Sequence, residues 1–295
     1  RSYTSDVTDD KEFLEATGKE FVGLFNKNQF KSYSSIYHAL KDSKMGDVDD
    51  ELGDIIDNLK ELVYNTPTYK MYKITYYAAA FKGKYKLNSS NNTWHKTSYD
   101  GHRIEFKDKD GRDCVLEAKT SGEEKNVYLF DDETTRGEYD YSNYPNISST
   151  SYKKKESYYA KLPEHIECTL TQGGTQLIKA IVDVDLSGVV ENQKFNPSRN
   201  SVSMKYTLNL RDLVNISAYT NYVAQGTSKA GYTVTKNGRT IMTAAASANT
   251  ALTSTSIEDF DEDDKDNLNA ASINIDILGK IQLKGDSRSA SNVIK

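Results

Sequence analysis

The feature that most constrains the fold is a β-hairpin that the sequence contains twice, 64 residues apart. The two copies are "TLTQGGTQLIKAIVD" at 169–183 and "TVTKNGRTIMTAAAS" at 233–247. In each copy, alternating strands flank a short turn that ends in Gly174 or Gly238, because a tight primed turn needs a positive φ that glycine adopts without steric cost. A weaker third copy surrounds Gly111 in "KDKDGRDCVLEA". Repeated hairpins of this kind build a wide antiparallel sheet.

The rest of the C-terminal half has the same two-residue period. Ile178, Ala180, Val182 and Val184 share one face of a strand, and "SVSMKYTLNL" at 201–210 alternates in the same way. We therefore predict an all-β region with repeated hairpins over 160–295. The acidic segment that includes 259–266 interrupts it as an exposed loop or a short helix, and it lacks the central Gly and the final Glu of a calcium loop.

The N-terminal region, residues 1–66, has a helical period instead. In "DVDDELGDIIDNLKELVYN", apolar residues recur at spacings of three and four from Val48 to Val63, which predicts an amphipathic helix with Asp47 as its N-cap. A second helix is expected within 9–26 and a short third one within 28–46. We predict a Tyr-rich antiparallel sheet over 67–135. Residues 136–159 lack a sustained period, so we expect a linker or mobile loop there.

These patterns together predict an α+β protein in which N-terminal helices pack on a large antiparallel β-sheet built from repeated hairpins. A chain of 295 residues is long enough to bury a substantial core without a metal or a disulfide. Cys114 and Cys168 are the only cysteines, and they fit either one disulfide or two inert buried thiols.

Composition narrows the range of partners. The formal net charge is -5, so nucleic acid and anionic membranes would meet a mildly repulsive surface. No stretch of the sequence approaches the roughly 20 apolar residues of a membrane-spanning helix. The 21 Tyr and 9 Phe add apolar area that the hydrophobic content of 37% understates.

The sequence contains no recognisable catalytic or cofactor motif. Gly-rich phosphate loops, the G-x-S-x-G elbow and paired Cys or His with zinc spacing are all missing. His95 and His102 form the best local cluster, but zinc needs a third ligand. We expect no cofactor, no metal site and no enzymatic activity, although a hydrolase with a dispersed site stays an alternative.

Three features suggest ligand contacts. The returning strand of the second hairpin contains small residues, among them Ala244, Ala246 and Ala248, and such a strand lets something approach its surface closely. A helix packed across this run is the favoured structural explanation, and a ligand is the other. Trp94 and Tyr144 are candidate exposed aromatics for stacking on a sugar.

Segments of the C-terminal half, including "LPEHIECTLTQGGTQLIKAIVDVDLSG" and "NLNAASINIDILGKIQLKG", resemble a group of uncharacterised extracytoplasmic lipoproteins of Bacteroides-type gut bacteria. The resemblance covers mainly residues 160–285 and is one of style and segment order. It implies a mature protein in the bacterial outer membrane or at the cell surface, attached to the membrane only by a lipid anchor on a Cys that this sequence does not contain.

Two functions follow as expectations. The first is a non-enzymatic cell-envelope or surface lipoprotein that acts as a binding or structural module, with a glycan, a lipid or an envelope protein as its partner. The second is a carrier that holds an apolar ligand in a cavity between the sheet and the helices, with the Ala-rich strand lining the cavity.

Overall fold

The computed structural model describes residues 7–256 and 269–289. The chain begins with the helices α1 (Val7–Gly23), η1 (Lys27–Phe30), α2 (Lys31–Lys41) and α3 (Gly46–Asn58). A short helix, η2 (Ala78–Phe81), follows the second strand. The first seven strands are β1 (Lys60–Asn65), β2 (Tyr69–Tyr77), β3 (Gly83–Asn88), β4 (Thr93–Thr97), β5 (His102–Lys107), β6 (Asp113–Asp140) and β7 (Ser148–Gln172). The last seven are β8 (Thr175–Asp185), β9 (Val202–Leu210), β10 (Val214–Tyr222), β11 (Thr227–Lys236), β12 (Arg239–Asn249), β13 (Asn269–Ile277) and β14 (Ile281–Ser289).

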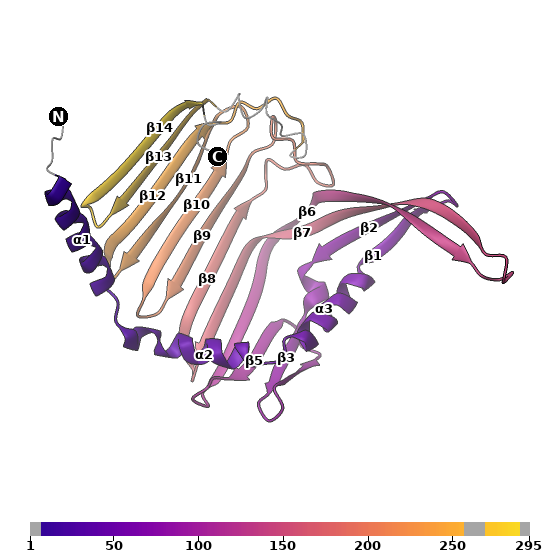
Figure 1. Cartoon of the computed structure of the whole chain (residues 1–295), viewed down its shortest axis with the longest axis horizontal. Helices are drawn as coiled ribbons and strands as arrows, with labels where there is room; N and C mark the ends of the chain where they lie inside the picture. Colours follow the sequence, from indigo (N-terminus) through magenta and orange to yellow (C-terminus); the bar gives the residue numbers. More distant parts are fainter. Residues whose placement is uncertain (1–6, 257–268, 290–295) are drawn as a thin grey trace.

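The strands form one 14-stranded sheet, which confirms the predicted α+β class (Figure 1). From β14 to β5 the spatial order of the strands follows the sequence, because consecutive strands pair as antiparallel hairpins or neighbours. β3 then pairs in parallel with β5, and β2 pairs in parallel with the first half of β7. The sheet therefore branches at β7, where β1 and β2 extend it on a second side.

The two hairpins identified in the sequence have the same local structure. Both turns contain two residues with positive φ, Gly173–Gly174 and Asn237–Gly238. The register of each hairpin shifts at the same place, after Leu170 in one and after Val234 in the other, which are 64 residues apart. The hairpin at Gly111 differs, since the turn between its paired residues Lys107 and Asp113 is longer. The repeat thus extends from sequence to turn type and bulge.

The N-terminal helices cross the ends of the strands at which these hairpins turn (Figure 1). Glu20 of α1 forms ion pairs with Arg239 at the β11–β12 turn and with Lys280 at the β13–β14 turn. Behind α1, the Phe25 ring lies 4.9 Å from the Nζ atom of the buried Lys236. We call residues 7–58 the helical belt.

The belt continues along the turns with α2. The Tyr33 hydroxyl donates hydrogen bonds to the carbonyl oxygens of Leu177 and Arg211, at 3.1 and 2.9 Å. The Gln172 side chain donates to the Ser32 carbonyl at 3.3 Å. One helical segment therefore joins the turns of successive hairpins and fixes their relative positions.

Each of these turns buries one aliphatic side chain near the belt. The four residues are Leu177, Leu213, Ile241 and Leu278, and each is less than a tenth exposed. In the two repeated hairpins the buried residue lies at the bulge, where the strand bends. The larger core cluster lies beside α2, where Ile36 and Ala39 pack against side chains from β3 to β8.

Two predicted elements differ in the structure. The predicted helix over 48–63 ends at Asn58, and Leu62 and Val63 belong to β1, where Leu62 pairs with Tyr72 of β2 and Val63 lies at a register shift. Asp47 is not the N-cap, because α3 begins at Gly46, and its carboxylate instead accepts a hydrogen bond from the Trp94 backbone N–H at 3.0 Å. Sheet pairing overrides helical periodicity at the end of this segment.

The expected loop over 136–159 is also wrong in its secondary structure. Residues 136–140 end β6 and residues 148–159 begin β7, and the two strands form a long hairpin that projects from the sheet (Figure 1). Ion pairs between the strands, such as Lys155 with Asp131 at 2.8 Å, support a segment that has little apolar periodicity. The division of the chain into domains stays a prediction.

Candidate functional site: the apolar face of the sheet

Directly paired residues in a sheet point to the same face, so the register shows what each face contains. One row of paired residues crosses nine strands without a polar side chain. The row is Ala118, Cys168, Ala180, Leu208, Ile216, Val234, Met242, Ile277 and Ile281. This face of the sheet is apolar from β6 to β14, and we refer to it as the apolar face.

The next row has the same character and alternates large and small side chains at its centre. It consists of Ile166, Val182, Tyr206, Ala218, Tyr232, Ala244, Ile275 and Leu283. The hydroxyl groups of its two tyrosines donate to methionine sulfurs, Tyr206 to Met204 at 3.1 Å and Tyr232 to Met242 at 3.9 Å. The sulfurs are weak hydrogen-bond acceptors, so both hydroxyl groups have a partner and the face needs no additional polar or charged side chain to supply one.

The opposite face is polar. The row that lies between the two described above consists of Lys119, Glu167, Ile181, Thr207, Ser217, Thr233, Thr243, Asp276 and Gln282. A sheet with one apolar and one polar face normally packs its apolar face against another layer.

In the part of the chain that the structure describes, α2 and α3 of the helical belt cover this face only over β3 to β8, at one end of the strands (Figure 1). At the opposite end Leu252 packs against Tyr222 and Ala271. Between these ends the apolar side chains are only partly covered, and Ile273 and Leu283 are 44% and 56% exposed. The total accessible surface, 18906 Å², exceeds by about half the roughly 12,500 Å² expected for a compact protein of this length.

The apolar face continues into a pocket of about 430 Å³ between α2, α3 and strands β3 to β6. Leu40, Met45 and Val48 line it from the helices, and Ile104 and Leu116 line it from the sheet. Leu116 lies two residues before Ala118 on the same face of β6, so the pocket adjoins the β6 end of the first apolar row. We call it the apolar pocket.

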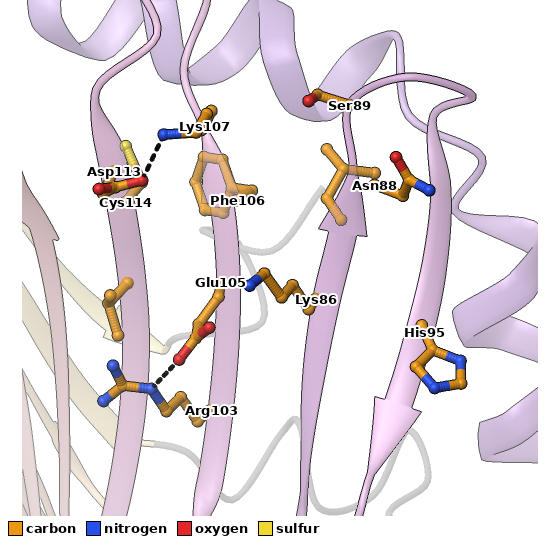
Figure 2. Close-up of a pocket in the computed structure, with 12 residues that line it drawn as sticks. Lys86, Asn88, Ser89, His95, Arg103, Glu105, Phe106, Lys107, Asp113 and Cys114 are labelled. Carbon is orange, nitrogen blue, oxygen red and sulfur yellow. Dashed lines mark hydrogen bonds and ion pairs between the residues drawn. The ribbon is translucent and has the colours of Figure 1, made fainter.

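A larger hollow of about 790 Å³ lies across β3 to β6, with charged side chains of the polar face around it (Figure 2). Its charges are largely paired within the protein: Arg103 with Glu105 and Lys107 with Asp113, each at 2.7 Å. The hydrogen bond from Arg103 lowers the pKa of the Glu105 carboxyl, which keeps this pair ionised. These pairs leave little unbalanced charge for a ligand.

The residues predicted to contact a ligand lie in three separate places. Ala244, Ala246 and Ala248 lie on the apolar face, where Ala246 is exposed and the other two are partly exposed. Among the described residues no helix packs across this run. Trp94 is 8% exposed and lines the apolar pocket. Tyr144, which is 78% exposed, lies at the tip of the β6–β7 hairpin.

The residues considered for catalysis or metal binding do not come together in one site. His95 and His102 lie on opposite faces of the sheet, and the His102 ring nitrogen contacts the Ala78 carbonyl at 2.7 Å. Within residues 7–256 and 269–289, no group of His, Cys, Asp or Glu side chains has metal-binding geometry. The acidic run 259–266 lies outside the described residues.

The two cysteines are free thiols rather than a disulfide. Burial raises the pKa of the Cys114 thiol to about 11, and burial also raises the pKa of the Cys168 thiol. Both therefore stay protonated near neutral pH, in a form that is a poor nucleophile.

Sequence reasoning missed the apolar face as a continuous surface. Its signal was the alternation within single strands, but only the register shows that the apolar positions of nine strands align.

No helix among the described residues is long and apolar enough to cross a membrane. No protein-family model, curated protein or solved structure matches this chain, so the resemblance to envelope lipoproteins stays a hypothesis.

Proposed function

We propose that the protein is a non-enzymatic carrier that binds an elongated apolar molecule, such as a lipid acyl chain, on the apolar face of the sheet. The observation that carries the proposal is the row of nine paired apolar residues from Ala118 to Ile281, most of whose length no described element covers. Covering such a surface is worth roughly 25 cal/mol for each Å² removed from water.

A chain-like ligand suits this site better than a flat protein partner. The β6 end of the open face adjoins the apolar pocket, which a flexible hydrocarbon chain can enter and a second sheet cannot. The small side chains of Ala244 and Ala246 lower the surface of the face beside the larger Tyr232 and Ile273. A hydrocarbon chain that follows this depression gains about 0.8 kcal/mol for each methylene group that it buries.

Filling the depression tests the proposal. We expect Ala246→Trp to weaken binding of 1-dodecylpyrene, an uncharged hydrocarbon probe, because the indole occupies the space of about three methylene groups. At 0.8 kcal/mol each this amounts to roughly 2.4 kcal/mol, or about fifty-fold in Kd. The measurement is a fluorescence titration of purified protein with the probe.

Ala245→Trp is the matched control, since Ala245 lies on the same strand, is also exposed, and points to the polar face. It should bind the probe as the wild type does. Equal Kd values for the two variants would contradict the proposal, as would a wild-type protein that takes up no probe. A concentration-dependent dimer in sedimentation that the probe does not dissociate would indicate that a second copy covers the face.

We further propose that this carrier works in the bacterial cell envelope, on the strength of the resemblance described above. Fractionation of the native organism with an antibody against the protein tests this proposal. Recovery from the outer membrane supports it, and recovery from the cytosol contradicts it. This result is independent of the binding measurement.

A further inference from the structure

Two buried polar atoms of the apolar pocket have no hydrogen-bond partner among the described residues. They are the Tyr85 hydroxyl oxygen and the Trp94 indole nitrogen, in residues that are 7% and 8% exposed. Tyr85 lies on β3 and Trp94 on β4, and both point to the apolar side of the sheet, toward α2 and α3. Buried polar atoms are nearly always hydrogen-bonded. These two atoms have almost no accessible surface in the ligand-free protein, so a ligand in the adjoining pocket supplies their partner when the two side chains turn toward it.

We propose that the ligand is an amphiphile whose uncharged polar end accepts hydrogen bonds from Tyr85 and Trp94, while its hydrocarbon chain lies in the apolar pocket and along the apolar face. An indole N–H can only donate, so the ligand must supply an acceptor such as an ester carbonyl or a hydroxyl oxygen. This inference rests on the proposed carrier function and specifies the chemical class of its ligand.

The charges around these two donors disfavour an anionic end group. A second hollow of about 330 Å³ shares Tyr85 and Trp94 with the apolar pocket. Its remaining lining residues include the α3 carboxylates of Asp47, Asp50, Glu51 and Asp54, together with Lys96 and His95. Lys96 is 3.6 Å from Glu51, and Lys41 is the cation that lines the apolar pocket. Four carboxylates outnumber the two lysines, and the resulting potential repels a fatty-acid carboxylate.

The chain contains a single Trp, so its indole N–H gives one cross-peak in a ¹H–¹⁵N NMR spectrum. We expect 1-oleoylglycerol to shift this proton downfield, because a hydrogen bond forms where none exists in the ligand-free protein. 1-Octadecene, which fills the same apolar space without an acceptor, should leave the proton near its original position. Oleate at pH 8 should bind more weakly than 1-oleoylglycerol.

Tyr85→Phe provides a second readout. We expect it to weaken 1-oleoylglycerol binding about fivefold, the effect of one neutral hydrogen bond, and to weaken 1-octadecene binding by less, because the alkene accepts no hydrogen bond from this hydroxyl. Because the hydroxyl has no partner in the ligand-free protein, the variant should melt at the same temperature as the wild type or higher. A fall of several degrees would show that this hydroxyl already has a partner and would overturn the inference.

The outcomes separate the two levels of the proposal. If 1-dodecylpyrene binds but 1-oleoylglycerol leaves the indole proton unmoved, the carrier function stands and the assigned ligand class is wrong. If oleate binds more tightly than 1-oleoylglycerol, the charge argument is wrong. If no hydrocarbon binds, the proposed function itself fails.

Discussion

Replacing Asp108 by Asn should destabilise the protein strongly, because this side chain is a fully buried hub between the β5–β6 turn and β7. Its side chain has no exposed area. One carboxylate oxygen accepts from the backbone N–H groups of Asp110 and Arg112, both at 2.9 Å. The other accepts from Arg112 Nε at 2.7 Å and from Gln172 Nε2 at 2.6 Å. Gln172 also bonds to Ser32, so Asp108 helps to place α2 over the apolar pocket.

The magnitude follows from the four donors. The Asn side chain keeps one oxygen acceptor. Whichever way the amide is turned, its NH₂ group faces two N–H donors, so the protein loses two charge-assisted hydrogen bonds. Each such bond contributes about 1.5–3 kcal/mol, so we expect the loss of two to lower the free energy of unfolding of Asp108→Asn by roughly 3–6 kcal/mol. This is a large part of the about 5–15 kcal/mol that stabilises a typical domain.

The assay is urea denaturation of wild type and variant between pH 3 and pH 8. Burial by itself raises the pKa of Asp108, but the backbone and guanidinium hydrogen bonds from Arg112 outweigh it, and the pKa lies below its ordinary value of 3.8. Because the pKa of Asp108 is lower in the folded than in the unfolded protein, the ionised carboxylate stabilises the folded protein at pH values above 3.8. This stabilisation is lost as the pH falls through the pKa of the folded protein. The difference between the two proteins should therefore be constant from pH 5 to 8 and shrink below pH 4.

Asp110→Asn is the matched control. Its carboxylate is 64% exposed and forms one ion pair with Arg112, so we expect a loss of less than about 1 kcal/mol. If Asp108→Asn costs no more than Asp110→Asn, or if its cost does not change toward acid pH, the assignment of Asp108 as a buried charged hub is wrong.

Two further predictions concern the turns and the thiols. Gly238→Ala should lower the free energy of unfolding, measured in urea, by about 1 kcal/mol, because Gly238 has a φ of +78°. Gly53→Ala in α3 should raise it by about 0.5–1 kcal/mol, since an added Cβ meets no atom within 4 Å. Equal effects of the two substitutions would contradict the turn geometry. Cys114 should resist iodoacetamide at pH 8 in the folded protein and react in urea, because it is buried and a pKa of about 11 leaves about 0.1% of it as thiolate. Rapid labelling of Cys114 in the folded protein would refute its burial.

The sequence predicted those elements in which local pattern and tertiary structure agree. The hairpins at Gly174 and Gly238 were predictable because two-residue turns require specific residues, and the N-terminal helices because a helical period is a local property of the sequence. The end of the helix predicted over 48–63 was not, since Leu62 and Val63 satisfy both a helical stripe and a strand that pairs with β2.

The hairpin over 136–159 escaped prediction for a different reason. Its strands are held by partners that are distant in sequence, such as Lys70 of β2, which is 2.8 Å from Glu138, and by ion pairs across the hairpin. The facing segments "DDETTRGEYD" and "SYKKKE" carry opposite charges, and this complementarity is the signal that could have indicated pairing.

The sequence identified single residues of the candidate site but not the surface that they form together. Ala244 and Trp94 were singled out for size and rarity, but their relation to the apolar face and the apolar pocket depends on strand register and on the position of α2. Neither property follows from local sequence. The unpaired hydroxyl of Tyr85 became visible only with the surrounding atoms in place.

The helical belt also determines the order in which the chain can fold. Glu20 pairs with Arg239 and Lys280, which are 219 and 260 residues away in the sequence, so α1 is synthesised long before the partners that it contacts. Contacts of such long range are slow to form, because the intervening chain must first be ordered. Until the β13–β14 hairpin has formed, the strands of the apolar face lack the α1 contacts that fix their ends. Apolar surface exposed in this way makes folding intermediates prone to aggregate.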